Sequence, residues 1–361
     1  MFLSKSTHDT ALSLLLLLLS LLAAPALLLA VTKTPHGRGL RIMINISHFA
    51  KSSAEPNPKI YADQHVIPRP YAQDSVAHAR AQLFTALELC EMGAEVVVHF
   101  DCAYDCGGEP DLAAFEGSCS TPEALELAFH QHDPSLGYHV TGVHRARVAD
   151  SVNNFDVFMY TEDDVLYTAG QILLYVDHQR RLLNAGLGLT HNVGFYRVEV
   201  NVTSSALEEA VFEETRVGPE GLDVLQLPVP ALYPGSGGNA SHGNGTDGNS
   251  TFEWPWYVIY RGNTYQGSWL LLQPQLRSYI KELEGARRGP RRGLIRETNA
   301  NWVYWLLQKQ KVIPLASFSQ FGVRHLGNYY LWTTKFGDNA RSTHQLQIEL
   351  LQLRARRELE V

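Results

Sequence analysis

Residues 155–165 read FDVFMYTEDDV, and this stretch is the strongest indication of the fold in the sequence. A mostly apolar run from Phe155 to Tyr160 is followed, after Thr161, by three consecutive acids, Glu162, Asp163 and Asp164. A run that is apolar on both faces is typical of a central strand in a parallel sheet, which helices cover on both sides. We therefore predict a buried strand over residues 155–160 that carries three carboxylates to the edge of a sheet.

The residues before this strand favour a parallel sheet. A strand is expected at 41–49, a helix at 75–92 and a second strand at 95–100, and this β-α-β order is typical of parallel pairing. We thus predict an α/β fold with a mainly parallel sheet flanked by helices. Elsewhere the patterns predict strands at 138–145, 194–202 and 256–260, and helices near 122–131 and at 168–185, 273–284, 297–308 and 341–359.

The position of the three acids suggests a ligand site. In open α/β sheets, ligands bind beyond the carboxyl ends of the strands. Adjacent carboxylates that are half out of water cost several kcal/mol unless a cation or hydrogen-bond donors compensate them. Hard oxygen ligands suit Mg²⁺, Mn²⁺ or Ca²⁺, and such a metal often completes its shell with phosphates. The alternative is an exposed acidic turn that stabilises the start of the following helix.

The N-terminal residues contain an uncharged, leucine-rich run from Ala11 to Val31. About 20 apolar residues span the hydrocarbon layer of a bilayer, and an ordinary signal peptide has a shorter apolar core. We predict a cytoplasmic tail at 1–10, a signal-anchor transmembrane helix at 11–31 and a short stem at 32–39. Cleavage near Pro25 is the alternative.

Sequons and cysteines indicate that the rest of the chain is lumenal or extracellular. Four cysteines within thirty residues suggest one or two disulfides in an oxidising compartment, and they leave three full connectivities open. A zinc site is the weaker alternative, because Cys102 and Cys106 have no second close pair of ligands. The disulfide candidates are Cys90, Cys102, Cys106 and Cys119, and the predicted glycosylation sites are Asn45, Asn201, Asn239, Asn244 and Asn249.

Charge and composition narrow the possible partners. The chain of 361 residues has a formal charge of −7 and no basic stripe with interleaved aromatic residues, so we expect no nucleic-acid partner. Residues 40–340 are predicted to form a single domain, with a flexible Gly/Ser/Asn insertion at 234–251. A charged helix at 341–361 follows.

The stretch FDVFMYTEDDV resembles the strand and the D-x-D-type motif of GT-A-fold glycosyltransferases. The resemblance covers roughly residues 40–335 in topology, but only short stretches in motif, and the triplet here is Glu-Asp-Asp. It implies a Rossmann-like GT-A fold and the transfer of a sugar from a nucleotide-sugar to a glycan, protein or lipid acceptor, with Mn²⁺ or Mg²⁺. The single anchor is similar to that of Golgi members, which implies a Golgi or ER membrane location; a secreted or cell-surface protein is the alternative.

The same resemblance suggests roles for individual residues. Asp164 is expected to bind the metal, while Glu162 and Asp163 hold the ribose of the donor or a metal-bound water. In the stretch RHLGNYY, His325 is the candidate for a late histidine that completes the metal shell. Arg324 is the candidate that binds the diphosphate through its planar guanidinium group.

Further candidates follow from the chemistry of the reaction. An inverting transfer needs a carboxylate that takes the proton of the acceptor hydroxyl, and Glu297 is our candidate, although it could equally stabilise a helix start. Arg69 and Arg80 are candidate phosphate contacts. Tyr265, Gln266 and Trp269 are candidates for lining a sugar or acceptor pocket, with ordinary packing as the alternative.

A second function class stays open at this point. A non-catalytic, lectin-like glycoprotein could use the same acids to hold Ca²⁺ and bind carbohydrate. A hydrolase is a weaker idea, because the sequence places no second carboxylate opposite Glu162.

Overall fold

The structure is a computed structural model, and it describes residues 38–48, 75–201, 208–211, 222–228, 255–260, 267–286, 302–326 and 341–359. Within these ranges no helix is long and apolar enough to cross a membrane. The signal-anchor predicted at 11–31 lies outside the described residues.

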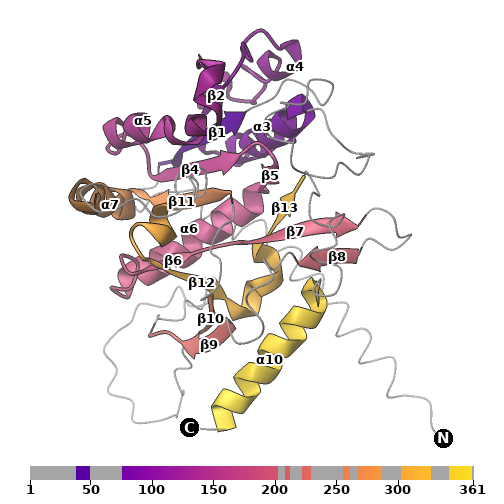
Figure 1. The fold of residues 1–361 in the computed structure, drawn as a ribbon, viewed down its shortest axis with the longest axis vertical. Coiled ribbons are helices and arrows are strands. Elements are labelled where there is room, and N and C mark those ends of the chain that lie inside the picture. The colour runs from indigo at the N-terminus through magenta and orange to yellow at the C-terminus, as the bar shows by residue number, and fades with distance from the viewer. Residues whose placement is uncertain are drawn as a thin grey trace, which may run out of the picture.

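A five-stranded mixed sheet forms the upper half of the molecule (Figure 1). Its order is β11-β4-β1-β2-β3; the last four strands are parallel to one another, and β11 is antiparallel to β4. This result confirms the predicted α/β fold with a mainly parallel sheet. The strands are β1 (Arg41–His48), β2 (Glu95–Cys102), β3 (Leu125–Gln131), β4 (Val157–Glu162) and β11 (Ser268–Leu272).

Helices cover both faces of this sheet, as the doubly apolar run of β4 predicts. On one face, Ile44 and Met159 share an apolar core with α3 (Ser75–Glu91) and α6 (Ala169–Asn184). On the other face, Phe158 shares a second core with residues of α5 (His144–Asp150), α7 (Gln273–Ala286) and α9 (Trp302–Trp305). All six residues of β4 are buried.

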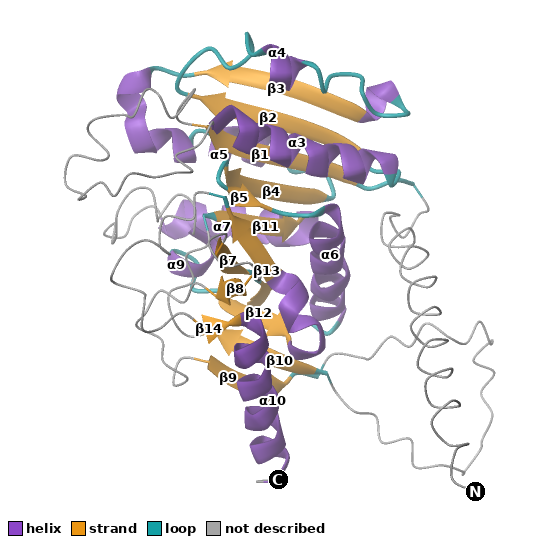
Figure 2. Ribbon diagram, turned by 90° about the vertical axis from the view of Figure 1, so that its right-hand side faces the viewer, coloured by secondary structure: helices purple, strands orange, loops and turns teal. Residues whose placement is uncertain are grey.

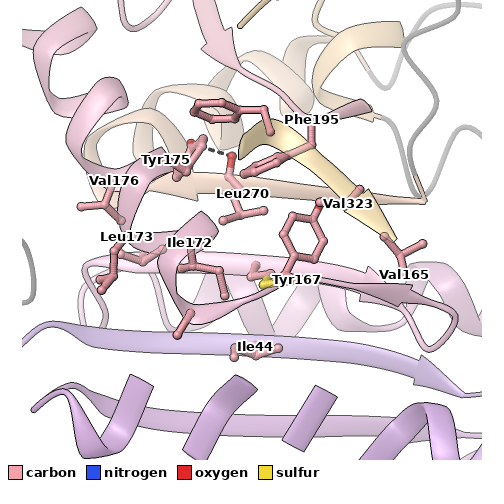
Figure 3. Packing of buried hydrophobic residues seen from close by; sticks show 14 of the residues in the cluster. Ile44, Val165, Tyr167, Ile172, Leu173, Tyr175, Val176, Phe195, Leu270 and Val323 are labelled. Atoms are coloured by element: carbon pink, nitrogen blue, oxygen red, sulfur yellow. Dashed lines mark hydrogen bonds between the residues drawn. The ribbon is translucent and has the colours of Figure 1, made fainter. Parts of the chain in front are cut away.

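The start of α6 is fixed by a capping box. The Thr168 hydroxyl accepts a hydrogen bond from the Gln171 backbone N–H, and the Gln171 side chain accepts one from the Thr168 N–H. The Gln171 amide also donates to the Gly322 carbonyl at 2.6 Å. Further along α6, Ile172 and Tyr175 point into the core, where the Tyr175 hydroxyl donates to the Leu270 carbonyl (Figure 3).

Two smaller sheets lie below the first (Figure 2). One has the order β6-β12-β10-β9, and the other β14-β8-β7-β13-β5. Their strands are β5 (Val165–Leu166), β6 (His191–Val193), β7 (Tyr196–Asn201), β8 (Glu208–Val211), β9 (Leu222–Gln226), β10 (Trp256–Tyr260), β12 (Gln310–Pro314), β13 (Gly322–His325) and β14 (Arg341–Ser342). The helix α10 (Thr343–Leu359) buries Leu346 and Leu350 against this part of the molecule. The remaining short helices are α4 (Pro110–Ala113), η1 (Pro122–Ala124), η2 (Pro134–Gly142) and η4 (Leu315–Phe321).

Two local predictions are wrong. The helix expected near 122–131 is a short 3-10 turn followed by strand β3, because pairing with β2 outweighs the helix propensity of Leu125, Glu126 and Ala128. The strand expected at 138–145 is instead the end of η2 and the start of α5.

All four cysteines are paired. Cys90 of α3 bonds to Cys119, and Cys102 bonds to Cys106, only four residues further along. The structure thus selects one of the three connectivities that the sequence left open. The first disulfide joins a helix to the segment before β3, whereas the second closes a short loop directly after β2.

Candidate functional site

The four parallel strands bring polar residues to one edge of the sheet. The strands β1, β2, β3 and β4 end at His48, Cys102, Gln131 and Glu162, and in a parallel sheet these ends lie on the same side. The chain then turns through Asp163 and Asp164 into β5. We call Glu162, Asp163 and Asp164 the acid edge.

Glu162 is the most enclosed of the three acids, with 2% of its surface exposed. Its backbone N–H donates to the carbonyl of Gly267, which precedes β11. Gly267 has a φ of +67°, and a Cβ atom there would lie 3.1 Å from the Glu162 Oε2 atom. Glycine is therefore required at this position both by the backbone conformation and by the close approach of the carboxylate.

Asp163 is anchored from the neighbouring strand. Its backbone N–H donates to the Ser47 carbonyl, and its Oδ2 atom lies 2.5 Å from the Nδ1 atom of His48. The other ring nitrogen of His48, Nε2, is hydrogen-bonded to the Tyr104 hydroxyl. His48 has no exposed surface, whereas 14% of the Asp163 side chain is exposed.

Asp164 contacts residues of β13, a strand far along the chain. Its Oδ2 atom lies 3.1 Å from the Nε2 atom of His325, and its carbonyl accepts from the Leu326 backbone N–H. The antiparallel pairing of β13 with β5 sets His325 opposite Val165, the residue that follows Asp164. The structure thus brings together the two residues that the sequence suggested as metal ligands.

His78, on α3, is a further member of the site that sequence reasoning missed. Burial lowers the pKa of its ring, as do nearby His325 and His48, while the charges of Asp163 and Asp164 act to raise it. A histidine on a helix face carries no sequence signal for a site, because its neighbours come from β1, β4 and β13. Its pKa is lowered overall, so the imidazole is neutral at pH 7 and its nitrogens are able to act as ligands.

The donor set at this edge consists of carboxylate oxygens and imidazole nitrogens, a combination that suits Mn²⁺. Among the described residues, no group of three or more His, Cys, Asp and Glu side chains is arranged so that it could hold a metal ion. Asp164 and His325 are in direct contact instead.

A second polar cluster lies at the ends of β2 and β3. Asp101 has 1% of its surface exposed, and it accepts two hydrogen bonds from Arg147 and one from His132. Burial acts to raise the pKa of Asp101, but the hydrogen bonds and charge of Arg147, aided by His132, lower it overall. The pKa of nearby His99 is lowered to about 4, mainly by burial and also by the charges of Arg147 and His130.

The glycosylation predicted at Asn45 is wrong for this fold. Asn45 lies within β1 and is fully buried; its amide donates to the Met159 carbonyl and its oxygen accepts from Arg147. A glycan would be attached to the same Nδ2 atom that donates to Met159, and it would have no room in this buried position. Asn201 closes β7, and Asn239, Asn244 and Asn249 lie outside the described residues.

Trp269 also has a different role from the one predicted. It has 1% of its surface exposed, and its ring packs against those of Tyr160, His144 and Trp302. It is therefore a core residue on the covered face of the sheet rather than part of a sugar pocket. The sequence could not separate these readings, because an aromatic residue in an apolar strand fits both.

The remaining candidates are only partly placed. Arg80 lies on the exposed face of α3, with its Nη1 atom 3.4 Å from Asp111. Arg324 is exposed in β13, next to His325. Arg69, Tyr265, Gln266 and Glu297 lie outside the described residues, so their roles stay predictions.

No protein-family model matches the chain, and no curated protein matches it. Among solved structures, it is similar to a protein assigned as a glucose-1-phosphate thymidylyltransferase from Bacillus anthracis, in complex with sucrose. The two are 14% identical, the comparison covers 74% of this chain and 83% of that one, and the TM-score is 0.29. A likeness at this level carries no conclusion about what the chain does.

Proposed function

We propose that this chain is a metal-dependent glycosyltransferase, which moves a sugar from a nucleotide-sugar donor to a glycan, protein or lipid acceptor. The observation that carries the proposal is the contact of Asp164 with His325 at the carboxyl edge of a parallel sheet. The two residues are 161 positions apart and their atoms lie 3.1 Å apart. Such edges are where open α/β sheets bind ligands.

The donor atoms at the acid edge are of the types that a divalent cation prefers, although the described side chains are not arranged as a set of three ligands. Asp164 and His325, with Asp163 and His78 beside them, would hold Mn²⁺ or Mg²⁺. When bound, such a cation offsets the charge that grows on a departing nucleoside diphosphate. Glu162 is enclosed, whereas the side chains of Asp163 and Asp164 are partly exposed and would be the acids that reach a ligand.

The order of strands in the sheet supports a GT-A type of fold with a D-x-D-type motif. The acidic motif follows β4, which lies between parallel β1 and antiparallel β11. Arg324 is exposed and precedes His325 in the same short strand. It is therefore our candidate for the cation that binds a diphosphate.

The location of the protein is part of the same proposal. The two disulfides favour an oxidising compartment. Together with the apolar run at 11–31, this supports a Golgi or ER membrane protein whose body is lumenal.

A thermal-shift panel on the full chain tests the function. We expect UDP or GDP to raise the melting temperature in the presence of Mn²⁺ and to have a much smaller effect without it. In Asp164→Asn the shift should disappear. Asp150→Asn is the matched control, because Asp150 is an exposed acid at the end of α5, and it should keep the full shift.

The same panel separates the alternative. A lectin-like protein would be stabilised by carbohydrate with Ca²⁺ and would ignore nucleotides. Stabilisation of that kind, or a nucleotide shift that survives in Asp164→Asn, would contradict the transferase. Release of a nucleoside diphosphate from a panel of nucleotide-sugars would then identify the donor.

A further inference from the structure

Asp163, His48 and Tyr104 form a series of hydrogen-bonded side chains, and each lies at or just beyond the end of a different strand. The Oδ2 atom of Asp163 contacts the Nδ1 atom of His48, at the end of β1, and the Nε2 atom of His48 contacts Tyr104, just beyond β2. An ionised carboxylate only accepts hydrogen bonds, so His48 donates through Nδ1–H. In neutral His48, the Nε2 atom is then an acceptor, and the Tyr104 hydroxyl donates to it.

The Cys102–Cys106 disulfide closes the loop that carries Tyr104. Cys102 is paired with His48 in the register of β1 and β2, and the Ala103 N–H donates to the His48 carbonyl. Within the loop, the Cys106 N–H donates to the Tyr104 carbonyl. Both cysteines are buried, so the loop is anchored at each end with Tyr104 at its centre.

We propose that this loop is a positioning device for the acid edge: the disulfide fixes Tyr104, Tyr104 fixes the tautomer and the ring of His48, and His48 orients the Asp163 carboxylate. The inference rests on the proposed function and names residues that act through another, without touching the substrate. Partners of this kind, which orient a metal-binding group, typically change metal affinity or activity 10- to 100-fold.

The Cys90–Cys119 disulfide provides a control within the same chain. It joins α3 to the segment before β3, whereas His48 and Tyr104 lie at the ends of β1 and β2. Its loop is longer, so in the chain-entropy account its removal should lower stability more than removal of the short disulfide. If both disulfides only stabilise the fold, removal of Cys90–Cys119 should have the larger effect on every property. If Cys102–Cys106 positions the acid edge, its removal should have the larger effect on metal affinity.

The test measures Mn²⁺ affinity by electron paramagnetic resonance of the free ion, together with kcat, KM and melting temperature. Tyr104→Phe keeps the ring and removes only the hydroxyl, and we expect it to weaken Mn²⁺ binding about 10-fold with little change in melting temperature. Cys102→Ser/Cys106→Ser should weaken Mn²⁺ binding to a similar extent. Cys90→Ser/Cys119→Ser should lower the melting temperature more and leave Mn²⁺ affinity unchanged.

Conservative replacement of His48 sharpens the test. In His48→Asn, the amide N–H replaces the Nδ1–H donor, so more affinity should remain than in His48→Ala. Because the Asn side chain has no second nitrogen facing Tyr104, adding Tyr104→Phe to His48→Asn should change nothing further. Independent, additive losses, or an unchanged Mn²⁺ affinity in Tyr104→Phe, would overturn the proposal.

A readout without metal distinguishes this inference from the proposed function. If the wild-type chain binds neither Mn²⁺ nor nucleotide, the transferase fails, but ¹⁵N NMR of His48 still tests the positioning device. We expect the Nδ1–H tautomer in the wild type, with an Nε2 resonance that shifts in Tyr104→Phe and in Cys102→Ser/Cys106→Ser but stays in place in Cys90→Ser/Cys119→Ser. An Nε2 resonance that ignores the first two changes would overturn the device by itself.

Discussion

The acid edge and the surroundings of Lys311 in β12 are two regions where charged groups are taken out of water in different ways. At the acid edge, Asp163 and Asp164 each contact a histidine, and 14% of each side chain stays exposed. Lys311 has 2% of its surface exposed, and its Nζ atom lies 4.8 Å from the centre of the Tyr260 ring.

The two regions differ in what compensates the charge. Burial alone lowers the pKa of Lys311 to about 7, and among the described residues no carboxylate pairs with it. Gly194 leaves room for its stem, since a Cβ there would lie 2.5 Å from the Lys311 Cγ atom. Paired charges that remain partly open can exchange a protein partner for a ligand, whereas a sealed charge without a carboxylate mainly costs stability.

The largest expected effect is on the acid edge. His325→Gln removes the imidazole that contacts Asp164. If His325 holds a metal as the proposed function requires, we expect the proposed transferase activity to fall about 100-fold or more, because a metal ion contributes several kcal/mol to the stabilisation of a developing charge. Steady-state kinetics with the donor identified by the nucleotide panel would measure it. Activity within a factor of three of the wild type would remove His325 from the site.

Lys311→Met should have the opposite consequences to His325→Gln: it should raise the stability of the fold and leave activity unchanged. A pKa lowered from 10.5 to about 7 sets an upper bound of about 5 kcal/mol on the cost of burying the charge, and we expect a gain of about 2–3 kcal/mol at pH 7. Denaturant unfolding measures this gain. A loss of stability would mean that Lys311 has a compensating partner and that the contrast with the acid edge is false.

The pH dependence of that gain follows from the sign of the shift. The folded pKa lies below the unfolded value, so between pH 7 and 10.5 the unfolded chain binds more protons and wild-type stability rises with pH. The full cost is present below pH 7 and is lost by pH 10.5. Lys311→Met should therefore gain less and less over the wild type across this window.

Patterns along the chain predicted the parallel half of the fold better than the rest. The β-α-β order, the buried strand before the acids and the amphipathic α6 depend on local periodicity, which the sequence carries. The misassigned β3 depends on pairing with β2, which is a tertiary effect. Asn45 and Trp269 were misread because neither motif nor residue type reports burial.

At the candidate site, sequence reasoning found the acids and His325 but not their partners. His48 ends a predicted strand, and Tyr104 lies in a cysteine-rich segment, yet nothing in either stretch indicates the other. Their contact requires the β1–β2 register and the closed loop after β2. Partners of this kind become visible only when strand order and disulfide connectivity are known.

An intermediate effect is expected from His178, a half-buried histidine of α6. Burial and the charge of Arg181 lower the pKa of His178 to about 3, so the unfolded chain binds more protons between pH 3 and 6.5. Stability should fall by about 2 kcal/mol from this group as the pH drops from 6.5 to 5. His178→Phe should lose that part of the acid sensitivity in denaturant unfolding at the two pH values, and an unchanged slope would contradict it.

The smallest effect tests whether the ring of Tyr260 compensates the charge of Lys311. A cation over an aromatic face is stabilised by about 0.5–2 kcal/mol, but only while the amine is protonated. Tyr260→Leu should therefore cost about 1 kcal/mol more at pH 6 than at pH 9, because the pKa of Lys311 lies between them. The same change in a Lys311→Met background removes the cation, so its cost should be equal at both pH values. A pH-dependent cost that persists without Lys311 would assign the effect to another group and contradict the role of the Tyr260 ring.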